Sequence, residues 1–146
     1  MAITVRAAAV GDETRCMALI ETLTGAAATR DWRATYTRLL GGERGAVLVA
    51  EDAGTILGVV TVSYNLAIRY GGEYCQLEEL IVDRAARGKN VGGLLMEAAV
   101  NAARTRGCTE MGLYLLESTE GNRPFYAKYG FVGVGSEMRQ SLRPGD

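Results

Sequence analysis

Apolar residues follow two kinds of spacing along the chain, one typical of helices and one typical of strands, and the spacing changes near the middle. Residues 3–6 alternate in the manner of a short edge strand. After Gly11 and Asp12 the apolar residues follow a helical spacing as far as Gly25, and a second helical pattern runs from about residue 31 to residue 40. The first third of the chain is therefore predicted to be one strand followed by two helices.

The middle of the chain is rich in β-branched residues and reads as strands. Residues 46–50 and 55–67 flank the turn sequence Asp52-Ala53-Gly54, which predicts a β-hairpin. Residues 74–82 form a third apolar run, interrupted only by Glu78 and Glu79. Three consecutive strands are expected here.

The last part of the chain returns to helical spacing and then mixes the two patterns. A glycine-rich loop at residues 87–93 opens a long amphipathic helix that ends near Gly107. A strand at 111–116, a short helix at 122–129 and a final strand from Phe131 complete the order. No repeat or linker divides the chain, so a single α/β domain over residues 1–146 is expected.

Composition narrows the chemistry that this domain can perform. The 146 residues carry a net charge of −1 and contain no histidine. We expect no binding to nucleic acid or membrane, no metal site of the Cys/His type and no histidine-based triad. The three cysteines form no metal-binding spacing, and no apolar run approaches the roughly 18 residues of a membrane span, so a cytoplasmic protein is expected.

The loop at residues 87–93 is the strongest chemical signal in the sequence. Glycines at 88, 92 and 93 leave main-chain N–H groups uncovered, and the helix that follows adds its own unpaired N–H groups and positive dipole end. Arg87 and Lys89 add positive charge. Such a loop binds phosphate groups. The P-loop and dinucleotide-binding patterns are both absent. The loop is therefore either a phosphate site of another kind or a glycine-rich helix N-terminus with no ligand.

Two segments resemble the signatures of the GNAT superfamily of N-acetyltransferases. The loop Arg87-Gly88-Lys89-Asn90-Val91-Gly92 is similar to the family pattern Arg/Gln-x-x-Gly-x-Gly/Ala, with Asn90 where glycine is usual. Asparagine tolerates positive φ well, so we expect the turn to be preserved. The segment from Asn122 to Phe131 looks like the family's Asn…Phe-Tyr-x-x-x-Gly-Phe stretch.

The resemblance implies a fold and an acyl donor. The fold is a mixed, mostly antiparallel sheet of about six to seven strands flanked by about four helices. The donor is acetyl-coenzyme A, with its pyrophosphate held by the loop and its pantetheine arm paired with the strand before the loop. No metal is required. The residues assigned to donor binding are Leu80, Ile81, Val82, Arg87, Gly88, Lys89, Asn90, Val91, Gly92, Gly93, Asn122 and Tyr126.

The same resemblance assigns roles in catalysis. Tyr126 matches the family's tyrosine and is the candidate acid for the departing thiolate, and the Leu80 N–H is the expected donor to the thioester carbonyl. Glu78 and Glu79 are the candidate bases, because two carboxylates in an apolar strand are costly without a purpose or partners. Strict alternation would place them on opposite faces of the sheet, with Glu78 ranked first, although family members often have a bulge in this strand.

The acceptor is predicted only as a class. The stretches that form the acceptor pocket in the family offer Trp32, Tyr36, Tyr64, Tyr70, Tyr74, Glu78 and Glu79. Aromatic rings and carboxylates suit a cationic amine, which leaves small molecules and protein lysines open. The predicted function is acetyl transfer to a primary amine through a ternary complex, and the alternative is a catalytically weak coenzyme A-binding regulatory module. A homodimer is expected from family habit.

Overall fold

The computed structural model describes residues 2–145, which form two compact units. The first unit extends to Leu113 and the second begins at Tyr114. The first contains the sheet and three of the helices, and the second contains a short helix and the C-terminal segment. Each unit is described below by itself.

The first unit is built on one sheet in which neighbouring strands follow the order of the chain. Strands β1 to β4 pair in antiparallel fashion, and β5 pairs with β4 in parallel. The strands are β1 (Thr4–Ala7), β2 (Gly45–Asp52), β3 (Thr55–Ala67), β4 (Gly72–Val82) and β5 (Met111–Gly112). Ala53 and Gly54 connect β2 and β3 with φ of 49° and 84°. Positive φ at both central residues matches the right-handed twist of a hairpin, as the turn sequence predicted.

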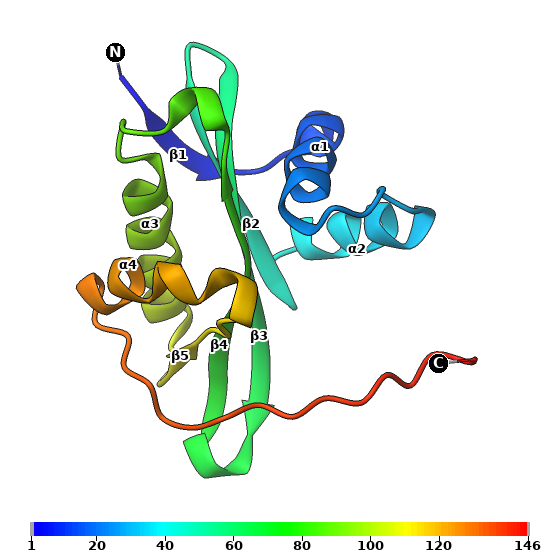
Figure 1. The fold of residues 1–146 in the computed structure, drawn as a ribbon, viewed down its shortest axis with the longest axis vertical. Helices are drawn as coiled ribbons and strands as arrows, with labels where there is room; N and C mark the ends of the chain where they lie inside the picture. The colour runs from blue at the N-terminus through cyan, green and yellow to red at the C-terminus, as the bar shows by residue number, and fades with distance from the viewer. Residues whose placement is uncertain (1, 146) are drawn as a thin grey trace. The chain divides into compact units, whose positions relative to one another are not determined.

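Helices cover both faces of this sheet, as Figure 1 shows. On one face lie α1 (Glu13–Thr24) and α2 (Arg30–Leu40), and on the other lies α3 (Val91–Arg106). Buried side chains of α1 and α2 pack on β2 and β3 in a core made of Cys16, Met17, Leu19, Tyr36, Val47, Val49, Ile56 and Val59. All three helices lie where the apolar periodicity predicted them.

Close packing of α3 on the sheet depends on a glycine in β3. A Cβ at Gly58 would lie 2.9 Å from the Ile81 carbonyl oxygen and 3.0 Å from a methyl of Leu95. No side chain at residue 58 would fit between the strands and α3, so the close approach of α3 to the β3–β4 pair requires glycine there. The start of α3 is thereby fixed beside the end of β4.

A β-bulge interrupts the pairing of β3 with β4. Thr61 pairs with Glu79 and Val62 with Leu77, so Glu78 is the extra residue. A bulge turns the strand and breaks the alternation of its side chains. Residues after Glu78 therefore present the opposite parity to those before it.

The strand count is where the structure departs from the sequence prediction. The described residues form five strands, not six or seven, and residues 131–142 adopt no regular structure. Val132, Val134, Met138 and Leu142 are at least 77% exposed. A strand requires a neighbour to supply ladder hydrogen bonds, and an alternating pattern does not provide one. The strand predicted at 111–116 likewise shortens to Met111–Gly112.

The second unit contains the short helix α4 (Arg123–Lys128), which the sequence predicted. It follows a 3₁₀ segment, Glu117–Asn122, and has a proline in its first turn. Across residues 2–145, no helix is long and apolar enough to span a bilayer.

Candidate active site

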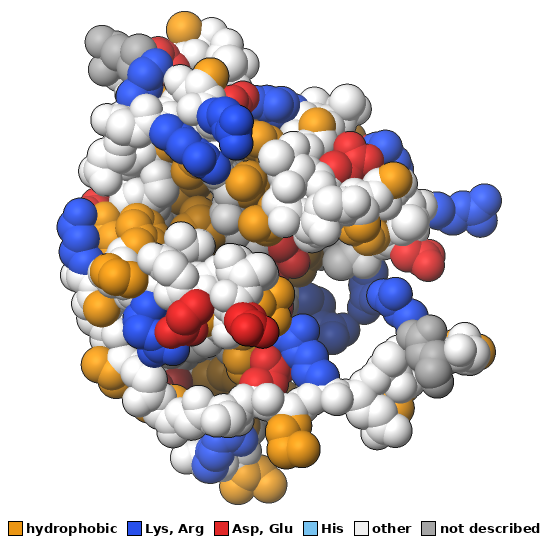
Figure 2. Space-filling model, viewed as in Figure 1, with side chains coloured by type: hydrophobic (Ala, Val, Ile, Leu, Met, Phe, Trp, Pro, Cys, Tyr) orange, Lys and Arg blue, Asp and Glu red, His pale blue; other side chains and the backbone are white. Residues whose placement is uncertain are grey.

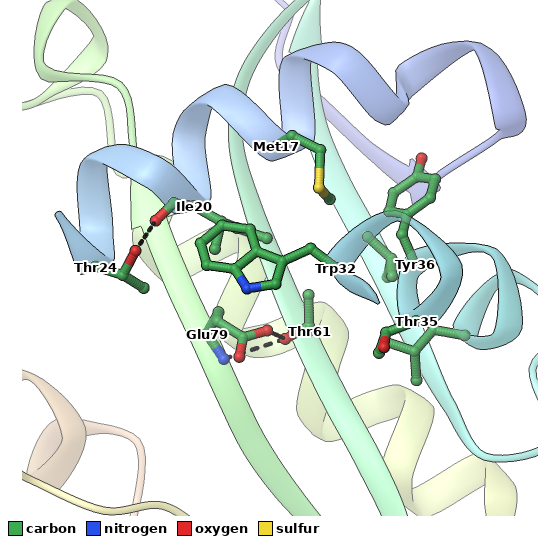
Figure 3. A pocket seen from close by; sticks show the side chains of 10 residues that line it. Met17, Ile20, Thr24, Trp32, Thr35, Tyr36, Thr61 and Glu79 are labelled. Carbon is green, nitrogen blue, oxygen red and sulfur yellow. Dashed lines mark hydrogen bonds between the residues drawn. The ribbon is translucent and has the colours of Figure 1, made fainter. Parts of the chain in front are cut away.

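Glu79 projects from β4 into a cavity on the face covered by α1 and α2. The cavity has a volume of about 240 Å³. Figure 3 shows Glu79 and Thr61 side by side on the sheet, with Trp32 reaching over them from α2. The lining consists of Met17, Ile20, Thr24, Trp32, Thr35, Tyr36, Leu39, Val47, Thr61 and Glu79. It is an apolar chamber with one carboxylate.

The Thr61 hydroxyl holds the Glu79 side chain and backbone together. This hydroxyl accepts a hydrogen bond from the Glu79 N–H at 3.1 Å and donates one to the Glu79 carboxylate. Thr61 is only 3% exposed, so the contact is shielded from water. Burial raises the pKa of the Glu79 carboxyl, and the hydrogen bond from Thr61 opposes that rise. A carboxylate with a raised pKa is a stronger base than an ordinary one.

Glu78 lies on the same face of the sheet as Glu79 but outside the cavity. Its carboxylate accepts a hydrogen bond from the Ser63 hydroxyl at 2.7 Å, and the residue is exposed. Ser63 and Thr61 are two positions apart on β3, so their side chains share a face. Strict alternation is therefore wrong at this pair, because the bulge at Glu78 turns both carboxylates to one side.

The aromatic residues predicted for the acceptor pocket separate into three groups. Trp32 and Tyr36 line the cavity, although the Tyr36 hydroxyl donates a hydrogen bond to the Ala9 carbonyl at 2.6 Å. Tyr64 lines an adjoining hollow and stacks under the Arg106 guanidinium at 4.5 Å. Tyr70 and Tyr74 pair with each other, with ring centroids 5.1 Å apart, and line neither space.

After the bulge, the edge of β4 facing away from β3 pairs with no other strand of residues 2–145. β5 covers only Cys75 and Gln76 on that edge. The Asp83 N–H donates to the Leu57 carbonyl of β3, and the Glu79 N–H also points to β3. Because alternate N–H groups of a strand point the same way, those of Leu80 and Val82 point to the open edge.

The bulge is what gives Leu80 this orientation. Before it, the Cys75 N–H donates to the Glu110 carbonyl beside β5, so odd-numbered residues face that edge. After it, odd-numbered residues face β3 and even-numbered residues face the edge. Without the extra residue, the Leu80 N–H would point to β3 and form a hydrogen bond with that strand.

The loop after β4 leads into an uncapped helix start. Gly88 and Asn90 have φ of 87° and 60°, so Asn90 adopts the left-handed conformation expected of it. The first α3 hydrogen bond runs from the Leu94 N–H to the Asn90 carbonyl, and the Asn90 side chain caps nothing. The N–H groups of Val91, Gly92 and Gly93 therefore have no helical acceptor.

This helix start is open to solvent and positively charged. Residues 87–90, which include Arg87 and Lys89, are all exposed. Figure 2 shows basic side chains gathered over the loop between β4 and α3. Free N–H groups, the dipole of a 16-residue helix and two cations together form a fitting cradle for a diphosphate.

An ion pair that sequence reasoning missed fixes the base of this loop. Arg15 of α1 contacts the Asp83 carboxylate and the Ile56 carbonyl. Asp83 in turn accepts a hydrogen bond from the Ala85 N–H at 2.9 Å and begins the 3₁₀ turn Arg84–Ala86. No local signal in the sequence joins residues 68 positions apart.

In the second unit, Tyr126 is half-buried in an aromatic cluster. Its ring packs edge-on against Phe125 at 5.2 Å and Phe131 at 6.3 Å, and burial raises the pKa of its hydroxyl. Asn122 precedes α4 without forming a side-chain cap. The raised pKa keeps this hydroxyl protonated and makes it a weaker acid than an ordinary tyrosine.

The buried cysteines are unsuited to nucleophilic chemistry. Burial raises the pKa of Cys16 to about 11 and that of Cys75 to about 12. Both are fully buried and serve as small apolar side chains. Within residues 2–145, no group of three or more His, Cys, Asp or Glu side chains is arranged to hold a metal ion.

An open strand edge beside an uncapped glycine-rich helix start is the arrangement that the resemblance to the GNAT superfamily implied for the acyl donor. Comparison with known proteins agrees with this class. A model of the Acetyltransferase (GNAT) family matches residues 14–131. The chain belongs to this family, whose members take their acetyl group from acetyl-coenzyme A, and the resemblance of the two motifs is confirmed.

Individual relatives show the same relationship. The chain is 38% identical over 96 residues to glucosamine 6-phosphate N-acetyltransferase 1 of Oryza sativa subsp. japonica, covering 63% of this chain and 56% of the relative. It spans 56 to 64% of the length of the three curated relatives it matches.

Solved structures share the fold at low identity. A transcriptional regulator from Bacillus halodurans C-125 has a TM-score of 0.87 at 20% identity, covering 97% of this chain and all of the other. The structure of AAC(6')-Iy in complex with a coenzyme A bisubstrate analogue has a TM-score of 0.85 at 17% identity, covering 98% of this chain and 99% of the other. The expected fold is thus confirmed, with fewer strands than predicted.

Proposed function

We propose that this chain transfers the acetyl group of acetyl-coenzyme A to the primary amine of a small molecule by direct attack in a ternary complex. The observation that carries the proposal is the adjacency of Glu79 and Leu80 in β4. The Glu79 carboxylate faces the cavity, and the Leu80 N–H faces the open strand edge. One dipeptide thereby joins an acceptor space to a donor space.

Glu79 is the base in this proposal, in preference to Glu78. An amine must be neutral to attack a thioester, so its proton has to leave first. Glu79 lies in the cavity and has a raised pKa, whereas Glu78 is exposed and bound by Ser63. A buried carboxylate both attracts an ammonium group and accepts its proton.

Main-chain groups supply the remaining stabilisation on the donor side. The Leu80 N–H would donate to the thioester oxygen as negative charge develops on it. The N–H groups at residues 91–93 would hold the diphosphate, with Arg87 and Lys89 adding charge. Tyr126 would give its proton to the departing thiolate, a role that rests on the family motif it matches.

The character of the cavity supports a small acceptor. At about 240 Å³ it has room for a compact amine, and its lining includes the Trp32 ring, an aromatic group that can attract a cation. The curated relatives are named as glucosamine 6-phosphate N-acetyltransferases, so amino sugars head the list of acceptors. A protein lysine would have to enter the same chamber.

Thiol release from acetyl-coenzyme A with a panel of amines tests the proposal. We expect turnover with at least one small primary amine and a matching acetylated product by mass spectrometry.

Glu79→Gln should lower kcat by about 10²- to 10⁴-fold, with Glu78→Gln as the matched control that changes little. Tyr126→Phe should lower kcat without changing coenzyme A affinity. Coenzyme A binding without turnover on any amine would instead support the regulatory module.

A further inference from the structure

A second hollow adjoins the cavity and has the opposite charge. Its volume is about 160 Å³, and it is lined by Thr35, Arg38, Leu39, Arg44, Ser63, Tyr64 and Asn65. Thr35 and Leu39 line both spaces, so the two are neighbours along α2. One holds a carboxylate and the other holds two arginines.

Arg38 and Arg44 give this hollow its positive charge. Among residues 2–145, no acidic side chain forms an ion pair with Arg38 or Arg44. Arg38 of α2 and Arg44 of the loop before β2 both line this one small space. Guanidinium forks suit phosphate and carboxylate oxygens because they can donate two parallel hydrogen bonds.

The backbone that carries Arg44 is held in place by its neighbours. The Tyr64 N–H donates to the Arg44 carbonyl at 2.9 Å. Arg106 donates to the carbonyls of Gly42 and Glu43 at 2.8 and 2.7 Å, while its guanidinium stacks on Tyr64 and pairs with Glu73. The loop before β2 is thus tied to β3 and α3. A fixed loop presents its arginine with less entropy to lose on binding.

Polar groups on β3 extend the hollow towards the carboxylates. The Asn65 amide donates to the Ser63 hydroxyl at 3.0 Å, and that hydroxyl donates to Glu78. Charge therefore changes from positive at Arg38 and Arg44 to negative at Glu78 and Glu79. An acceptor that spans both spaces would meet carboxylate at one end and arginine at the other.

We propose that Arg38 and Arg44 bind an oxyanion group of the acceptor, a phosphate or a carboxylate, while its amine lies at Glu79. This inference rests on the proposed function and names the substrate class as a small amine with an anionic tail. Arg38 and Arg44 are then specificity-determining residues outside the reacting centre. Their contribution is to binding, so they act on KM and not on kcat.

Matched pairs of amines test the class directly. Glucosamine is compared with glucosamine 6-phosphate, and ethanolamine with O-phosphoethanolamine and β-alanine. We expect kcat/KM to favour an anionic member by about tenfold or more, and the preferred anion separates phosphate from carboxylate. Arg38→Gln and Arg44→Gln should each remove most of that preference through KM and leave the neutral amines unchanged. Arg104→Gln, on the opposite face, is the control.

Two results would overturn the assignment while leaving acetyl transfer intact. One is equal kcat/KM for charged and neutral members of each pair, and the other is an equal loss on both members in the arginine variants. If no amine is acetylated, the proposed function fails, and the anion site at Arg38 and Arg44 is then tested separately by measuring anion binding. Inorganic phosphate and acetate should then bind the wild-type protein more tightly than the double variant in calorimetry. Equal binding would refute the site.

Discussion

Glu79 owes its properties to two neighbours that the chain brings from other elements. Thr61 supplies a hydroxyl from β3, and Trp32 covers the cavity from α2. The first contact stabilises the ionised carboxylate, and burial destabilises it. Because both effects act on a single group, its pKa can be moved in a chosen direction by changing one neighbour.

Removing the Thr61 hydroxyl should move the pH dependence of catalysis. In Thr61→Val the hydrogen bond that favours the charged form is lost, so the pKa of Glu79 should rise further. A base is active when deprotonated, and the acidic limb of the kcat/KM profile should therefore shift to higher pH. Thr55→Val, at the exposed start of β3, is the control. A profile in Thr61→Val that overlays the wild type would exclude Glu79 as the base.

Some residue-scale features could be predicted from sequence and others could not. The positive φ of Asn90 follows from its residue type and its place in the glycine-rich loop. The common orientation of Glu78 and Glu79 does not, because it depends on a bulge set by pairing with β3. Thr61 and Arg15 lay outside the motifs, and their roles depend on contacts between distant segments.

At the scale of elements, β4 and the loop after it form the functional unit. The bulge turns the Leu80 amide outwards, the open edge begins beyond Gln76, and α3 starts without a side-chain cap. Arg15 joins this unit to α1 through Asp83. The orientation of the loop is thus linked to the helix that also lines the cavity.

Breaking that ion pair should loosen the donor site more than the fold. Arg15→Gln should raise the Kd of coenzyme A by about two- to fivefold, because the loop loses an anchor that is itself partly exposed. Arg33→Gln, which breaks the ion pair with Glu13 on the helical layer, should leave that Kd unchanged. The comparison is made by calorimetry. Equal Kd values for the two variants would show that the pair does not position the loop.

Element boundaries could be predicted where one apolar periodicity continued along the segment. The prediction was wrong where a strand required a neighbouring strand to pair with. The helices α1, α2 and α3 and the β2–β3 hairpin follow from periodicity and turn chemistry. The strand expected from Phe131 onwards has the right alternation but no ladder in residues 131–142. Strand formation is decided by a neighbour elsewhere in the chain, and local pattern carries no information about it.

At the scale of the whole molecule, the chain combines a family fold with its own acceptor surface. The fold is shared by structures at 17 to 20% identity, and the proposed donor side is built largely from main-chain groups of that fold. The proposed acceptor side consists of side chains, among them Trp32, Arg38, Arg44 and Glu79. This division explains why the sequence motifs identified the donor and left the acceptor open.

A crystal structure of the protein with coenzyme A tests the central claim most directly. The account predicts the diphosphate against the N–H groups at residues 91–93, and the pantetheine arm along the open edge of β4. The sulfur end should then lie within reach of the Leu80 N–H and the Glu79 carboxylate. Coenzyme A bound elsewhere, or an edge at residues 80–82 closed by another strand, would contradict it.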